Sequence, residues 1–115
     1  MIKKCLAAFA FAFSGIWYCI QKEQNFRIQL LAIPVVVFLG IVYSLRAGEW
    51  IFILISIAAV LSLEMINTGI EKICNFIQPA QHPQIKIIKD VSAGAVLIVS
   101  IMAFICSLII FLPKI

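Results

Sequence analysis

The feature that most constrains this chain is a run without any charge at residues 91–112, VSAGAVLIVSIMAFICSLIIFL. About 20 apolar residues in helical conformation are enough to cross the hydrocarbon layer of a membrane. Two further stretches of the same kind lie at 28–45 and 50–70, and two prolines predict a loop over 75–85. The chain as a whole is 64% apolar, whereas soluble domains are about 45–50% apolar. The sequence therefore predicts an all-α membrane protein with three transmembrane helices and excludes an ordinary soluble or disordered chain.

The N-terminal residues differ from these three stretches. Residues 1–22 are apolar but begin with two lysines, and Trp17 and Tyr18 lie near their end. Aromatic residues of this kind are typical of helices at the headgroup level of a membrane. We therefore expect residues 1–27 to form an interfacial surface helix within a single membrane domain that spans 1–115. A secretory signal peptide, in which the two lysines precede a short apolar core, is the alternative.

The basic residues are distributed unevenly across the expected membrane. Three spans place the two ends of the chain on opposite sides, and seven of the nine lysines and arginines fall on the side of the N-terminus. Because basic residues favour the cytoplasmic side, we expect the N-terminus to be cytoplasmic. The net charge of +4 is therefore interpreted by position, and no nucleic-acid partner is expected. The four cysteines lack metal-ligand spacing and are interpreted as small apolar residues.

Glu64 is the most unusual residue, because it stands inside the second expected span. A carboxylate that faces lipid there costs about 2.5–3.5 kcal/mol. Asn67, Thr68 and Glu71 follow at i+3, i+4 and i+7 and share one helical face with Glu64. Carboxylate oxygens suit Mg²⁺, and a carboxylate tuned by burial suits a general base. This polar stripe can serve both purposes, although such stripes also serve helix packing, and Glu64 could instead reach the surface at a helix end.

Further polar residues lie at the same membrane edge. They precede the first and third spans and are Glu23, Asn25, Arg27, Lys86, Lys89 and Asp90. Basic groups beside carboxylates suit a nucleoside triphosphate with its metal, although the same lysines also suit lipid phosphates. The chain has no glycine-rich phosphate-binding loop. Three helices offer little protein to bury the stripe, so we expect a homo-oligomer whose neighbouring chains complete each site.

Three motifs, in this order, resemble the prokaryotic diacylglycerol kinase/undecaprenol kinase family: EQNFR at 23–27, ExxNTxIE at 64–71 and KDxxAGAV at 89–96. The resemblance extends over most of the chain, about residues 10–113. It implies a homotrimeric bundle with an N-terminal surface helix and three spans per chain, in the bacterial inner membrane. It also implies a lipid kinase that moves the γ-phosphate of Mg-ATP to the hydroxyl of a membrane lipid at the cytoplasmic face.

The resemblance also implies a role for individual residues, carried over by motif position. Glu64 corresponds to the general base that takes the proton from the lipid hydroxyl, and Glu23 and Glu71 correspond to the metal ligands. The implied nucleotide contacts are Glu23, Asn67, Glu71, His82, Lys89 and Asp90. The implied contacts to the lipid substrate are Asn25, Arg27, Glu64 and Ala93.

The chain departs from the family pattern mainly near its N-terminus. Ser14, Lys4 and Phe11 stand where members of the family carry Asn, Arg and Tyr, and Asn75 stands where Asp is common. These departures affect the expected N-terminal nucleotide contacts and leave the three motifs intact. The stretch ExNFRI at 23–28 resembles the branch that phosphorylates undecaprenol more than the branch that favours diacylglycerol.

Two other classes of protein stay open at this point. A small proton-coupled transporter would use Glu64 as its membrane carboxylate. Such transporters usually have four spans and an earlier key glutamate, and Glu23, Glu71, Lys89 and Asp90 would be unexplained. A purely structural membrane subunit would use Glu64 for packing alone.

Overall fold

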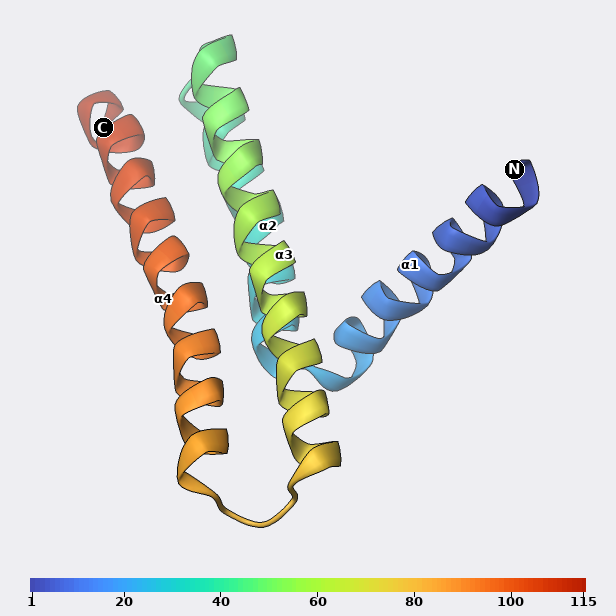
Figure 1. The fold of residues 1–115 in the computed structure, drawn as a ribbon. Helices are drawn as coiled ribbons and strands as arrows, with labels where there is room; N and C mark the ends of the chain where they lie inside the picture. The colour runs from blue at the N-terminus through green and yellow to red at the C-terminus, as the bar shows by residue number, and fades with distance from the viewer.

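A computed structural model describes all 115 residues of the chain. The helices are α1 (Ile2–Lys22), α2 (Gln24–Val42), α3 (Ala47–Ile77), α4 (Pro83–Phe111) and the short 3-10 helix η1 (Leu112–Lys114). There are no strands, which confirms the predicted all-α class. The four α-helices are each long and apolar enough to cross a membrane. Figure 1 shows α2, α3 and α4 alongside one another, whereas α1 leads away from them.

The long helices do not coincide with the predicted apolar stretches. The helix expected at 50–70 continues to Ile77, and the one expected at 91–112 already begins at Pro83. Hydropathy detects only the part of a helix that is apolar, whereas the backbone hydrogen bonds continue through polar residues. Polar residues next to the spans are therefore helical and not in loops.

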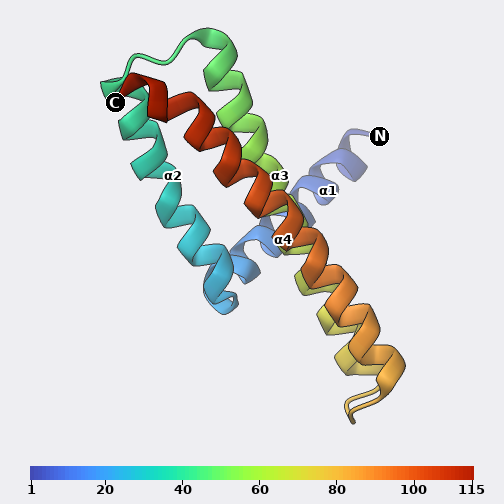
Figure 2. The same ribbon diagram turned by 90° about the vertical axis from the view of Figure 1, so that its left-hand side faces the viewer.

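The loop between α3 and α4 is shorter than the predicted 75–85, because only 78–82 lie outside the helices. Pro83 begins α4 and does not interrupt it. Proline is well suited to the first helical position, where its missing N–H would have no partner within the helix. As a result, α3 and α4 form a hairpin around a five-residue connection (Figure 2).

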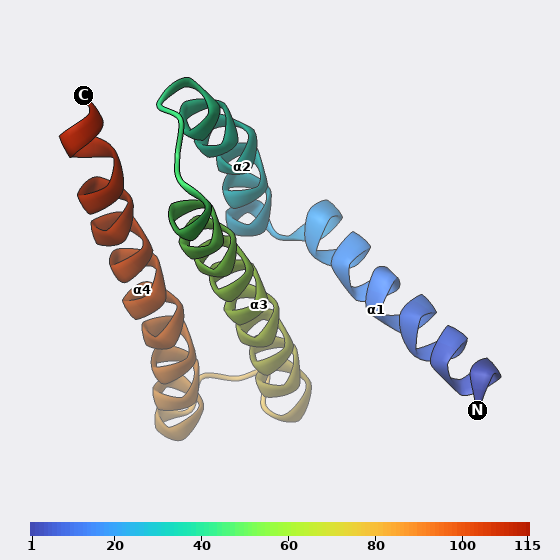
Figure 3. The same ribbon diagram turned by 90° about the horizontal axis from the view of Figure 1, so that it is seen from above.

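A single residue separates α1 from α2. Glu23 has extended backbone, with φ −109° and ψ 110°, and the chain changes direction there (Figures 1 and 3). Cys19 and Phe26, on either side of this break, are buried. The large apolar side chains earlier in α1 are exposed, including Phe9 and Phe13. The placement of α1 on the membrane surface stays a prediction; the fold shows a separate helix that ends at Lys22, earlier than the expected 27.

The opposite end of the bundle is held together by a tight turn between α2 and α3. Ser44 in this turn has a positive φ of 52°. Gly40 packs directly under the ring of Trp50, where an added Cβ would lie 2.5 Å from the nearest ring carbon. The carboxylate of Glu49 pairs with Lys114 over 3.1 Å and so ties the end of the chain to this turn.

Very little of the single chain is buried. Ten of the 115 residues are buried, and large apolar side chains on every long helix are exposed. Three of the ten are polar, namely Glu64, Thr68 and Ser92. In a membrane the exposed apolar surface contacts lipid or further protein, so the fold is that of a multi-pass membrane protein.

Candidate active site

Glu64 is buried between α3 and the first turns of α2, with 8% of the residue exposed. Gln29 of α2 donates a hydrogen bond from Nε2 to Oε1 of Glu64 over 2.9 Å. The second carboxylate oxygen of Glu64 receives no hydrogen bond from a side chain. The hydroxyl of Thr68 donates to the backbone carbonyl of Glu64 over 3.0 Å, within the same helix. Thr68 therefore belongs to the stripe by position, but its hydroxyl proton is already used.

Asn67 connects the stripe on α3 to α4. Its Nδ2 donates to Oε1 of Glu71 over 3.3 Å, and its Oδ1 accepts from the hydroxyl of Ser92 over 2.6 Å. A carboxylate only accepts hydrogen bonds, so the nitrogen of the amide must face Glu71. Asn67 thereby fixes one oxygen of Glu71, and Ser92 in turn fixes Asn67.

The break before α2 brings Glu23 towards the same end of α3 as Glu71. The ammonium group of Lys72 lies over the ring of Tyr18, 5.2 Å from its centroid. Interaction with Tyr18 is the main cause that raises the pKa of Lys72, and the carboxylates of Glu23 and Glu71 raise this pKa further. Both carboxylates therefore act on the ammonium group of Lys72.

Glu23 and Glu71 are the two carboxylates that the family resemblance assigns to a magnesium ion. The chain contains no group of three or more His, Cys, Asp or Glu side chains that could hold a metal ion by themselves. Mg²⁺ in nucleotide sites is usually held by one or two carboxylates together with the phosphates. Glu23 and Glu71 supply that number of carboxylates.

Three of the six predicted nucleotide contacts, His82, Lys89 and Asp90, lie at or next to the start of α4. Lys89 donates to Oδ1 of Asn75 over 2.6 Å, and Lys86 pairs with Asp90 over 2.6 Å. The Nδ1 atom of His82 accepts from the backbone N–H of Gln84 and caps the helix. The four charged or titratable residues line one hollow around the 78–82 loop: His82, Lys86, Lys89 and Asp90. The structure thus gathers three of the predicted nucleotide contacts, while His82 also serves as a helix cap.

Three predicted lipid contacts, Asn25, Arg27 and Ala93, make no hydrogen bond with Glu64 in the single chain. Arg27 donates from Nη1 to the backbone carbonyl of Gln21 over 2.8 Å and so caps the C-terminal end of α1. Asn25 and Ala93 are exposed. No hydrogen bond joins any of them to Glu64, so their role in binding lipid stays a prediction.

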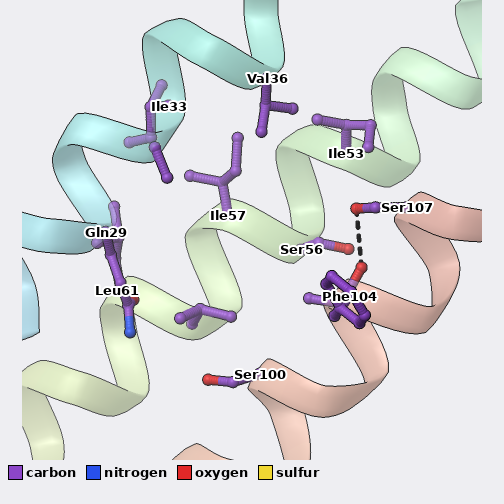
Figure 4. Close-up of a pocket in the computed structure, with 13 residues that line it drawn as sticks. Gln29, Ile33, Val36, Ile53, Ser56, Ile57, Leu61, Ser100, Phe104 and Ser107 are labelled. Carbon is purple, nitrogen blue, oxygen red and sulfur yellow. Dashed lines mark hydrogen bonds between the residues drawn. The ribbon is translucent and has the colours of Figure 1, made fainter. Parts of the chain in front are cut away.

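An apolar pocket of about 250 Å³ lies between α2, α3 and α4. Gln29, the partner of Glu64, lines it together with aliphatic residues such as Ile33, Ile57 and Leu61 (Figure 4). Ser107 also lines it, but its hydroxyl donates to a backbone carbonyl of its own helix. The pocket can therefore hold an apolar chain within the bundle, next to the amide of Gln29 and its partner, the carboxylate of Glu64. Sequence reasoning missed both Gln29 and Ser92, because neither belongs to the stripe on α3.

The comparisons with known proteins agree with the resemblance to a kinase family. The family model described as prokaryotic diacylglycerol kinase matches residues 10–111. The undecaprenol kinase of Bacillus subtilis is 35% identical over 113 residues, which cover 98% of this chain and 92% of that protein. A diacylglycerol kinase of Synechocystis sp. is 30% identical over 109 residues, which cover 94% of this chain and 62% of that protein.

Proposed function

The chain belongs to the prokaryotic diacylglycerol kinase family and is a lipid kinase, and we propose that it phosphorylates a lipid hydroxyl with Mg-ATP at the cytoplasmic face of the bacterial inner membrane. One observation carries the proposal. Glu64 is a buried carboxylate with one oxygen held by Gln29. Because Gln29 also lines an apolar pocket, a lipid hydroxyl can approach the carboxylate from the bilayer.

In the proposed reaction Glu64 is the general base. The O–H bond of the lipid breaks, and its proton moves to the unpaired oxygen of Glu64. The lipid oxygen forms a bond to the γ-phosphorus, and the bond from that phosphorus to the β-phosphate oxygen breaks. ADP leaves with the electron pair, and Glu64 later releases its proton to water. Phosphoryl transfer of this kind depends mainly on alignment and charge neutralisation, with a base to take the proton.

The carboxylates of Glu23 and Glu71 are the proposed magnesium ligands. Magnesium held there would offset the negative charge of the phosphates. Asn67 contributes by holding Glu71 in one orientation, as its 3.3 Å hydrogen bond indicates. Lys89 and Asp90, in the hollow beside the 78–82 loop, are the proposed nucleotide contacts, with Lys89 neutralising phosphate charge.

We further propose a homotrimer with α1 on the cytoplasmic surface of the membrane. The small buried fraction of the single chain supports an assembly, because only ten of 115 residues are buried. The direction of α1, away from the other helices, supports a surface position. Asn25, Arg27 and Ala93 would then meet the lipid at the boundary between neighbouring chains.

Undecaprenol is the preferred candidate for the lipid acceptor, ahead of diacylglycerol. The ExNFRI stretch supports this choice, and so does the higher identity to the undecaprenol kinase, 35% against 30% for the diacylglycerol kinase. The alternative of a proton-coupled transporter finds no support, since both relatives are kinases by name.

The purified protein in mixed micelles, supplied with γ-labelled ATP and Mg²⁺, tests the proposal. Undecaprenol and diacylglycerol are offered in parallel at equal mole fraction. We expect label in lipid, with the faster rate for undecaprenol. A faster rate for diacylglycerol contradicts the choice of acceptor, and no label in either lipid with folded protein present contradicts the proposed reaction.

A further inference from the structure

Gln29 contains a buried polar atom that the proposed reaction does not use. The residue lies in the first turns of α2 and lines the apolar pocket (Figure 4). Its amide nitrogen donates to Oε1 of Glu64, but its amide oxygen is buried and has no hydrogen-bond partner. No other buried side-chain nitrogen or oxygen in the chain lacks a partner. Because buried polar atoms are nearly always paired, this oxygen requires a partner from outside the chain.

The orientation of the Gln29 amide follows from its contact with Glu64. An ionised carboxylate accepts hydrogen bonds and donates none, so the amide turns its nitrogen to Glu64 and its oxygen away. The oxygen can be satisfied only by a donor. The hydrocarbon region of a membrane holds little water, whereas the hydroxyl of a membrane lipid is a donor that arrives from the bilayer.

We propose that Gln29 is a positioning residue whose amide oxygen accepts the hydroxyl of the lipid substrate while its nitrogen holds Glu64. The inference rests on the proposed function, because it needs Glu64 as the proton acceptor. One planar amide contacts both groups, so the lipid hydroxyl is placed next to the carboxylate that deprotonates it. The single hydroxyl proton first points to the amide oxygen of Gln29, and the O–H bond then rotates towards the unpaired oxygen of Glu64. Glu64 takes the proton as the lipid oxygen attacks the γ-phosphorus and ADP leaves. Gln29 itself neither gains nor loses a proton.

This role predicts a selective effect on the lipid substrate. The amide contacts the hydroxyl, which undecaprenol and diacylglycerol share, and not the chain, in which they differ. Loss of the amide should therefore impair both lipids alike. The proposed nucleotide contacts Lys89 and Asp90 line the hollow around the 78–82 loop, which Gln29 does not line, so binding of ATP should be unaffected.

The test is steady-state kinetics of the full-length protein with Gln29→Met, which keeps the length of the side chain and removes both polar atoms. We expect kcat/KM for the lipid to fall about 10- to 100-fold, the range for hydrogen bonds that involve a charged group. KM for ATP should stay within about twofold. Gln29→His, which retains a donor and an acceptor, should recover most of the loss. Gln21→Leu, a similar change on an exposed side chain, is the matched control and should behave as wild type.

The outcomes separate this inference from the proposed function. If Glu64→Gln abolishes transfer while Gln29→Met keeps wild-type lipid kinetics, the positioning role is refuted and the proposed function stands. The positioning role would also be refuted if Gln29→Met changed the kinetic constants for lipid and for ATP equally and Gln29→His recovered neither. That result would show a merely structural role for Gln29. If Gln29→Met does not fold, Gln29→His serves as the test by itself. A changed KM for ATP in Gln29→His, with an unchanged kcat/KM for the lipid, would overturn the inference. A wild-type protein that labels no lipid refutes the proposed function itself.

Discussion

The contact between Gly40 and Trp50 gives the sharpest prediction about stability. A Cβ added to Gly40 would lie 2.5 and 2.8 Å from two carbons of the Trp50 ring and 3.1 Å from Leu45. Overpacking of this kind costs about 1–3 kcal/mol. Alanine in a helix recovers about 0.8–1.0 kcal/mol relative to glycine. Because the clash is with a rigid ring, we place the cost in the upper part of its range and expect Gly40→Ala to lose about 1–2 kcal/mol.

The assay is unfolding of the purified protein in mixed detergent micelles, followed by circular dichroism. Gly48→Ala is the matched control, because no atom lies within 4 Å of the Cβ that it would add, and it should be neutral or slightly stabilising. In the Trp50→Phe background, which removes the second ring, Gly40→Ala should cost less. A Gly40→Ala variant as stable as Gly48→Ala would refute the reasoning from this contact.

Two further predictions concern the two ends of the bundle. Glu71→Gln should raise the Mg²⁺ concentration needed for half-maximal activity, measured by Mg²⁺ titration, whereas Glu49→Gln at the far end should leave it unchanged; equal titrations would remove Glu71 from the metal site. The backbone N–H of Arg46 is the main cause that lowers the pKa of Glu49, and Lys114 lowers it further. Ionised Glu49 therefore stabilises the fold at pH values above its pKa in the unfolded chain, about 4.3. This stabilisation is lost as the pH falls through the pKa of Glu49 in the folded protein, which is lower. The stability advantage of wild type over Glu49→Gln, present at pH 7 in the same unfolding assay, should thus vanish in strong acid, and an advantage independent of pH would contradict the assignment.

The long helices could be predicted from sequence because each contains an apolar stretch long enough to cross a membrane. Their true ends could not, since hydropathy does not register a helix that continues through polar residues. Pro83 illustrates this limit. A proline in sequence predicts a break in a helix, but its position decides its effect, and at the first residue of α4 it begins the helix.

The candidate site shows a similar division. Spacing on one helix was enough to place Glu64, Asn67 and Glu71 on a common face, because helical periodicity is a local property. Gln29 and Ser92 bond to that face from 35 and 25 residues away in sequence, and no local pattern reveals such contacts. The i,i+4 bond from the Thr68 hydroxyl to a carbonyl is local and was open to prediction.

Glu64 is the proposed general base of this lipid kinase. Transfer of label from γ-labelled ATP to lipid by Glu64→Gln, beside wild type and Glu49→Gln, tests this claim most directly. We expect a loss of about 10²–10⁴-fold in the rate for Glu64→Gln, with binding of Mg-ATP retained, and wild-type rates for Glu49→Gln. Turnover of Glu64→Gln close to that of wild type would contradict it and move the base to another residue.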